Sequence, residues 1–168
     1  MFHAFRQNGP TPPAGCFGSG AQLLTPEGYR QVEDLSCGDL VIVGDGGHRR
    51  IESVISVQTR GVGYHAPILV LPGALGNKGM LTLSPGTRVR VVGWKAQLHR
   101  DRESAILPID ELVNGSSIVR EEKRKMQWHH VSCQNPQLLT FSGLQVECTD
   151  PQVNMSQQNA KLFQIEVR

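Results

Sequence analysis

The stretch GCFGSGAQLLTPEGYRQVEDLSCGDLVIVGDGG, residues 15–47, decides how the whole chain is interpreted. In it, short apolar runs at residues 23–25 and 40–43 each end in a turn, at residues 26–28 and 44–47. Glycines in such turns supply the positive φ angles that tight hairpins need. The stretch opens on Gly15-Cys16, and a cysteine after a glycine at the head of a strand can attack the upstream peptide carbonyl.

The same alternation of short apolar runs and turns continues along the chain, which has 18 glycines and 10 prolines. Short β-like runs recur at residues 51–58, 67–71, 80–83, 88–92, 128–133 and 137–141. We expect the last two runs to pair around Asn135-Pro136, and a short turn near residues 109–113 is the best helical candidate. Many short strands with regular turns predict an all-β fold, built as a compact barrel or a sandwich-like body.

The length and composition predict one domain with two extensions. A chain of 168 residues with 39% hydrophobic and 19% charged residues can bury a sizeable core, which we place at residues 16–148. Residues 1–15 are predicted to form an extended Pro/Gly-rich N-terminal arm. Residues 149–168 form a polar C-terminal tail whose last six residues alternate like a strand, and this strand either closes its own sheet or adds to a neighbour's.

Several classes of function are not expected from the composition. A net charge of +2 is too small to argue for a nucleic-acid surface. No stretch resembles a signal peptide or a membrane span, so we expect synthesis in the cytoplasm and no membrane partner. The four cysteines predict no disulfide framework. His129-His130 and Cys133 have metal-ligand spacing but lack a second half, so we expect no metal and no cofactor.

Taken in order, the motifs of residues 16–148 resemble the Hint (hedgehog/intein) superfamily, and within it the bacterial stand-alone Hint-type domains. The motifs are Cys16-Phe17, Thr25-Pro26-Glu27-Gly28, Val32-Glu33-Asp34-Leu35 with Gly38-Asp39, Asp45-Gly46-Gly47, Leu83-Ser84-Pro85 with Arg88-Val89, and Leu112-Val113-Asn114-Gly115. The resemblance implies a flattened all-β horseshoe with pseudo-twofold symmetry and a reactive cysteine near its centre.

The resemblance also implies a chemistry, an N-to-S acyl shift in which Cys16 attacks the Gly15 carbonyl and the chain is cleaved at Gly15-Cys16. The family assists this step with a Thr/Ser-x-x-His block, but residues 84–87 read Ser-Pro-Gly-Thr. Ser84 can still bond a carbonyl or an oxyanion, whereas Thr87 replaces the histidine and has no group that titrates near neutral pH. Losing a positioned acid–base catalyst costs roughly 10²–10⁴-fold in rate.

Other positions bear on the same chemistry. His130 falls where the family has a histidine, and it either replaces the missing acid or plays a structural role, which we favour. His65 is a second candidate substitute. Residues 136–138 read Pro-Gln-Leu where the family carries a His-Glu-Val type run, and Asn159 lacks the neighbours that splicing needs.

Three functions remain open at this point. We favour a degenerate Hint-like domain that acts as a structural or interaction module in an oligomer or larger assembly, such as a phage- or virion-like particle, with protein partners bound through the arm and the terminal strand. The alternative is slow autoprocessing at Gly15-Cys16. The third is a cysteine hydrolase acting on a separate substrate, with Cys16 as nucleophile and His130 as base.

Overall fold

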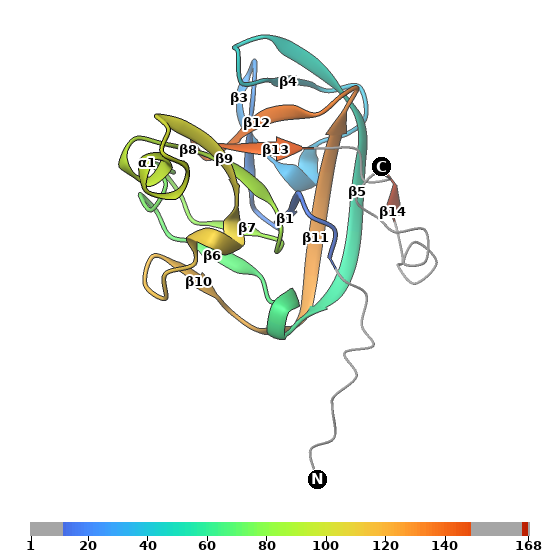
Figure 1. Ribbon diagram of the computed structural model, residues 1–168. Coiled ribbons are helices and arrows are strands. Elements are labelled where there is room, and N and C mark those ends of the chain that lie inside the picture. The colour runs from blue at the N-terminus through green and yellow to red at the C-terminus, as the bar shows by residue number, and fades with distance from the viewer. Residues whose placement is uncertain (1–11, 149–165, 168) are drawn as a thin grey trace.

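The computed structural model describes residues 12–148 and the backbone of residues 166–167. Most of the predicted N-terminal arm and C-terminal tail lies outside the described residues. The predicted all-β class is confirmed, because the described strands form two antiparallel sheets (Figure 1).

The first sheet has eight strands and contains the N-terminal strand. Its strands are β1 (Cys16–Gly18), β4 (Leu40–Ile42), β5 (His48–Gly61), β6 (Ile68–Val70), β7 (Leu81–Leu83), β10 (Ile118–Arg120), β11 (Lys123–Cys133) and β14 (Glu166–Val167). They run in the order β10-β6-β7-β1-β11-β5-β14, and β4 pairs with β5. Figure 1 shows β5 and β11 side by side as the two long strands.

The second sheet has six strands. They are β2 (Gln22–Thr25), β3 (Gly28–Gln31), β8 (Arg88–Val92), β9 (Ser104–Pro108), β12 (Gln137–Phe141) and β13 (Leu144–Cys148). Their order is β3-β2-β12-β13-β8-β9, so β3 and β9 are the outer strands. Over residues 12–148 and 166–167 neither sheet closes on itself, so the fold is a body of two sheets and not a barrel.

The turn predicted at residues 44–47 is confirmed as the connection of the β4–β5 hairpin. Val43 N–H donates to the Gly47 carbonyl at 2.8 Å, and Gly46 has a φ of +87°. A side chain at Gly46 would strain this backbone, so the local sequence itself specifies the hairpin.

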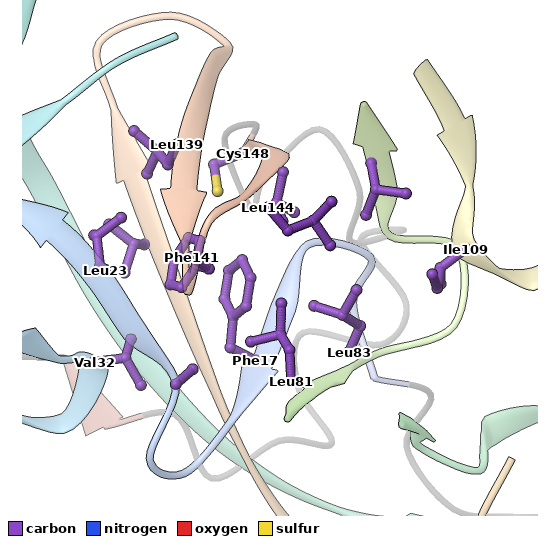
Figure 2. Packing of buried hydrophobic residues seen from close by; sticks show 14 of the residues in the cluster. Phe17, Leu23, Val32, Leu81, Leu83, Ile109, Leu139, Phe141, Leu144 and Cys148 are labelled. Carbon is purple, nitrogen blue, oxygen red and sulfur yellow. The ribbon is translucent and has the colours of Figure 1, made fainter. Parts of the chain in front are cut away.

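The two sheets meet through a pair of aromatic rings. Phe17 in β1 stacks on Phe141 in β12 with ring centroids 3.6 Å apart and an angle of 15° between the planes. Figure 2 shows the two rings face to face within the buried cluster, beside Leu23, Leu81 and Leu144. The ring pair therefore ties the eight-stranded sheet to the six-stranded one.

Successive residues of a strand point to opposite faces of the sheet, so Cys16 faces away from the Phe17 ring. Cys16 packs with Val57 and Trp128 in a second, smaller buried cluster. The Trp128 indole N–H donates to Thr59 Oγ1 at 3.0 Å, which satisfies its one polar group.

The helices are short. The turn predicted near residues 109–113 is confirmed as the 3₁₀ helix η3 (Ile109–Leu112). Two further 3₁₀ helices are η1 (Val32–Asp34) and η2 (Gly63–His65). The α-helix α1 (Trp94–Arg100) was not predicted, because its apolar residues face outward: Trp94 is 68% exposed and Leu98 71%, and only Ala96 is buried. No helix in the described part of the chain has the length and apolar character needed to cross a membrane.

One predicted strand pairing is wrong. The runs on either side of Asn135-Pro136 do form β11 and β12, but β12 pairs with β13 and β2 rather than with β11. The chain crosses from the first sheet to the second at this connection. The two strands are therefore neighbours in sequence but belong to different sheets.

The C-terminal strand had two predicted destinations. In the described part of the tail, Glu166 is paired with Ser56 and Val167 with Ile55. The strand β14 therefore extends the chain's own sheet along β5.

Candidate active site around Cys16

Cys16 is the first residue of β1, and β1 lies between β7 and β11. It has no exposed surface. Its partner across the β1–β11 ladder is His130, which is also buried. The pair predicted from sequence is thus brought together inside the eight-stranded sheet.

Ser84 and Thr87 lie in the turn that leaves β7 for β8. Thr87 N–H donates to the Ser84 carbonyl at 3.2 Å, and Gly86 between them has a φ of +80°. The helix η3 supports the turn from outside: Ile109 N–H donates to the Thr87 carbonyl, and Gly86 N–H donates to Asp110 Oδ2 at 2.5 Å. The supporting role of Asp110 joins residues far apart in sequence, so no local pattern could have predicted it.

The two hydroxyls hold the backbone just upstream of and at Cys16. Gly15 N–H donates to Thr87 Oγ1 at 2.8 Å, and Cys16 N–H donates to Ser84 Oγ at 3.0 Å. Ser84 Oγ donates to the Pro13 carbonyl at 2.7 Å, and the two hydroxyl oxygens are 2.9 Å apart. We call Ser84, Thr87 and these bonds the hydroxyl clamp.

The single proton of each hydroxyl can be assigned within the clamp. A serine hydroxyl donates once and accepts twice. Since Ser84 donates to Pro13, Thr87 must donate in the contact between the two hydroxyls. Ser84 then accepts from Thr87 and from Cys16 N–H, which fills both of its lone pairs. The clamp therefore offers an oxygen lone pair, and no proton, to the Cys16 nitrogen.

Burial also determines the state of the thiol. Desolvation by burial raises the pKa of the Cys16 thiol far above its ordinary value. The pKa of the Cys148 thiol is raised as well, mainly by burial and also by the neighbouring Cys133 and Cys16. Since a thiolate is the reactive form of cysteine, the folded site holds Cys16 in its unreactive state at neutral pH.

The imidazole of His130 lies against Gly15. A Cβ atom built on Gly15 would lie 3.5 Å from His130 Nε2 and 3.7 Å from the Glu147 carbonyl oxygen. Gly15 has a φ of +83°, a conformation that side chains rarely adopt. The residue before the predicted cleavage point is therefore held between the histidine and the clamp in a conformation that requires glycine.

The other histidines singled out from sequence lie elsewhere. His129 faces the opposite side of β11, where its ring nitrogens are each 3.0 Å from a hydroxyl, of Ser19 and of Ser56. His65 belongs to η2, beyond the end of β5, and in the described part of the chain it makes no hydrogen bond with Cys16 or the clamp. No group of three His, Cys, Asp or Glu side chains in that part could hold a metal ion.

The family model of the Hint domain matches residues 15–152 of this chain. The match begins at Gly15 and includes Cys16, Ser84, Thr87 and His130. Among curated proteins, none matches the chain.

Two solved structures of one intein are similar to this chain in fold. The crystal structure of the MchDnaB-1 intein is 14% identical with a TM-score of 0.51, over 79% of this chain and 99% of the intein. A variant of that intein gives the same identity and score over 80% and 99%. The solution structure of a bacterial intein-like domain from Clostridium thermocellum is 13% identical, over 80% of this chain and 98% of that one, at a TM-score of 0.36. At such identities the likeness to the intein concerns the fold alone.

Proposed function

This chain belongs to the Hint domain family, and we propose that it keeps the architecture of an autoprocessing domain while serving as a structural or interaction module. The module anchors its own N-terminal segment and takes part in an oligomer or a larger assembly, such as a particle formed in the cytoplasm. Cleavage at Gly15-Cys16 is not its main activity.

The observation that carries this proposal is the hydroxyl clamp. An N-to-S acyl shift must deliver a proton to the departing Cys16 nitrogen. Ser84 Oγ lies 3.0 Å from that nitrogen and accepts the Cys16 N–H. Thr87 stands where an acid would be needed, and its hydroxyl is used to accept Gly15 N–H. The clamp thus stabilises the intact peptide.

The state of the nucleophile points in the same direction. Attack on the Gly15 carbonyl needs a thiolate, and burial disfavours the ionised form of Cys16. Full burial of Cys16 also leaves no surface for a separate substrate, so a hydrolase acting on another molecule has no support.

The clamp suits an anchoring role. It fixes the Pro13 carbonyl and the Gly15 and Cys16 amides, so the segment that precedes Cys16 leaves the domain from one defined point. We propose that residues 1–11 contact a protein partner from this point. The strand β14 is proposed as a second contact, because a strand that pairs with β5 of its own chain can also pair with β5 of a neighbour.

Slow autoprocessing is a second candidate, and one observation favours it. The His130 ring lies against Gly15, at the residue whose carbonyl would be attacked. An imidazole titrates near neutral pH and can move a proton. It would have to supply the proton that the clamp does not.

Intact mass of the full chain separates the two candidates. The purified protein is incubated with and without dithiothreitol or hydroxylamine, beside Cys16→Ala. We expect the full-length mass to persist in all samples, because the clamp provides no acid at the Cys16 nitrogen. Thiol-dependent loss of residues 1–15 from the wild type, absent from Cys16→Ala, would establish autoprocessing instead.

A gain-of-function variant tests whether the missing acid at position 87 explains the lack of cleavage. Thr87→His restores the residue type that the family uses, and we expect thiol-dependent cleavage to accelerate by roughly 10²–10⁴-fold. Thr87→Val is the matched control, since it removes the hydroxyl without adding an acid and should not cleave. If the folded Thr87→His protein also stays intact, position 87 does not account for the missing activity.

A further inference from the structure

A groove lies on the outer face of the six-stranded sheet, and neither Cys16 nor the two clamp hydroxyls line it. It runs over β8 and β9 and has a volume of about 600 Å³. Its lining includes Arg88, Arg90, Arg100, Arg102, Ser104 and Leu138. We call it the arginine groove.

The strand period explains how β8 supplies two of the arginines. Val89 and Val91 are buried on the core side of β8, so the residues at the alternate positions, Arg88 and Arg90, face outward. Alternate residues of a strand lie roughly 7 Å apart. Arg100 is the last residue of α1, and Arg102 follows it in the connection to β9.

The positive charge of the groove is only partly balanced. Arg100 binds both oxygens of Glu111 at 2.9 Å, and Arg88 Nε is 3.8 Å from Glu147. Arg90 donates to Gln145, a neutral acceptor. In residues 12–148, no carboxylate forms an ion pair with Arg90 or Arg102. The groove therefore holds cationic groups with capacity to bind an anion.

Apolar residues in the lining of the groove strengthen its capacity to bind an anion. Ala105, Ile106 and Leu138 line the groove between the arginines, and all three are half-buried. Apolar walls lower the local dielectric and strengthen charge pairing. A guanidinium presents a planar fork that matches a carboxylate or a phosphate.

A neighbouring hollow indicates a ligand longer than a small anion. The next outward residue of β8 after Arg90 is Val92, which is 65% exposed. Val92 and Trp94 line a second hollow of about 240 Å³ together with Leu75 and Lys95. The exposed surface of β8 thus continues from cationic groups to apolar ones, as an extended peptide with both kinds of side chain would require.

We propose that the arginine groove binds an extended acidic segment of a partner protein. Carboxylates at alternate positions of the segment pair with the groove arginines, and a neighbouring apolar side chain enters the hollow beside Trp94. The chain's own terminal segments do not supply the acidic ligand. Residues 1–15 have no Asp or Glu, and residues 149–168 have only Asp150 and Glu166. This proposal rests on the proposed function in one respect, that the domain is an interaction module.

Fluorescence anisotropy tests the proposal with a labelled synthetic peptide of alternating glutamate and threonine that ends in leucine. The full-length wild-type protein is titrated, and the titration is repeated with Cys16→Ala. We expect saturable binding that Arg88→Gln, Arg90→Gln and Arg102→Gln together weaken at least about tenfold, since each removes one charge-assisted bond. Trp94→Ser should weaken binding by a smaller factor, about twofold to fivefold.

The matched control removes the same charge elsewhere. Arg60, Arg124 and Lys125 are exposed residues of β5 and β11, outside the groove. Changing all three to glutamine should alter the affinity by less than about twofold at moderate salt. Circular dichroism confirms that both triple variants fold.

Four results would overturn the proposal. They are no saturable binding of the peptide, equal weakening in both triple variants, displacement of the peptide by pyrophosphate or duplex DNA at lower concentration, and self-association of the chain that the groove variants abolish. The last two would reassign the groove to a phosphate ligand and to a second copy of the chain. Binding by Cys16→Ala is independent of cleavage, so a failure here and a failure of the intact-mass experiment are distinguishable.

Discussion

The hydroxyl clamp and the arginine groove both gather polar groups in one place, but they do so under opposite conditions. In the clamp, Ser84 and Thr87 are buried and neutral, and their hydrogen-bonding capacity is used within the chain. In the groove, Arg90 and Arg102 are exposed and charged, and no carboxylate of the described residues pairs with them.

This difference shows how each region can act. A buried polar group must be satisfied within the protein, because leaving it without a partner costs about 1–3 kcal/mol. Once satisfied, it orders the chain but has nothing left to offer a reaction. An exposed charged group is satisfied by water and can exchange that water for a ligand. The clamp, which resembles an active site, is therefore suited to holding the backbone in place. The arginine groove on the outer face is suited to binding a ligand.

The largest expected effect comes from the residue that joins the sheets carrying the two regions. Phe17→Ala removes the ring that stacks on Phe141, and it should lower the free energy of unfolding by about 3–5 kcal/mol. Urea unfolding gives the value, with Tyr29→Ala on the exposed surface of β3 as a control near zero. Because the ring pair connects both sheets, the clamp and the groove should be lost in one transition. Two separate transitions would mean that the sheets fold independently.

An intermediate effect is expected within the clamp alone. Ser84→Ala leaves the Pro13 carbonyl and Cys16 N–H without their partner, and it should cost about 1–3 kcal/mol in unfolding free energy. Ser36→Ala, at an exposed position, should cost less than about 0.5 kcal/mol. Affinity for the acidic peptide should stay unchanged in Ser84→Ala. Loss of that affinity would show that the clamp and the groove are coupled.

The smallest effect is a dependence on pH that belongs to the buried region. The folded-state pKa of Cys16 is raised, so its contribution to stability is present below the ordinary thiol pKa of 9.0 and is lost as the pH rises above it. Above that pH each such thiol should reduce the unfolding free energy by about 1.4 kcal/mol per pH unit. Urea unfolding at pH 8 and pH 10 should show a shallower dependence in Cys16→Ala. Cys37→Ala, at an exposed site, should behave like the wild type, and identical slopes in all three proteins would contradict the assignment.

Much of the fold was predictable because its signals are local. The hairpin at residues 44–47 depends on glycine conformation within the turn itself, and β8 matches the predicted run at residues 88–92. The helix α1 was missed because Trp94 and Leu98 point outward, so the chain has no buried helical stripe there. The pairing around Asn135-Pro136 was wrong because the choice between sheets is made by partners distant in sequence.

The sequence pattern indicated which residues lie close together at the candidate site but not the hydrogen bonds between them, and their catalytic roles stay a prediction. Cys16, Ser84, Thr87 and His130 are brought together as the family pattern implied. The use of the two hydroxyls to hold Pro13 and Gly15 could not be foreseen, because it depends on which way each hydroxyl faces after folding. The arginine groove also had no signal, since its members are scattered over β8 and the end of α1.

The pairing of β14 has a mechanical consequence. Cys16 pairs with His130, His130 with Ile55, and Ile55 with Val167, so the first residue of β1 and the end of β14 lie in one row across the sheet. Successive antiparallel pairing also makes the chain enter β1 and leave β14 at the same end of the sheet. Tension applied between these two points would peel strands off one by one instead of shearing them together. The short β14 should detach first, while the clamp still holds the backbone at the start of β1. The domain would therefore begin to unfold under tension from its C-terminal strand.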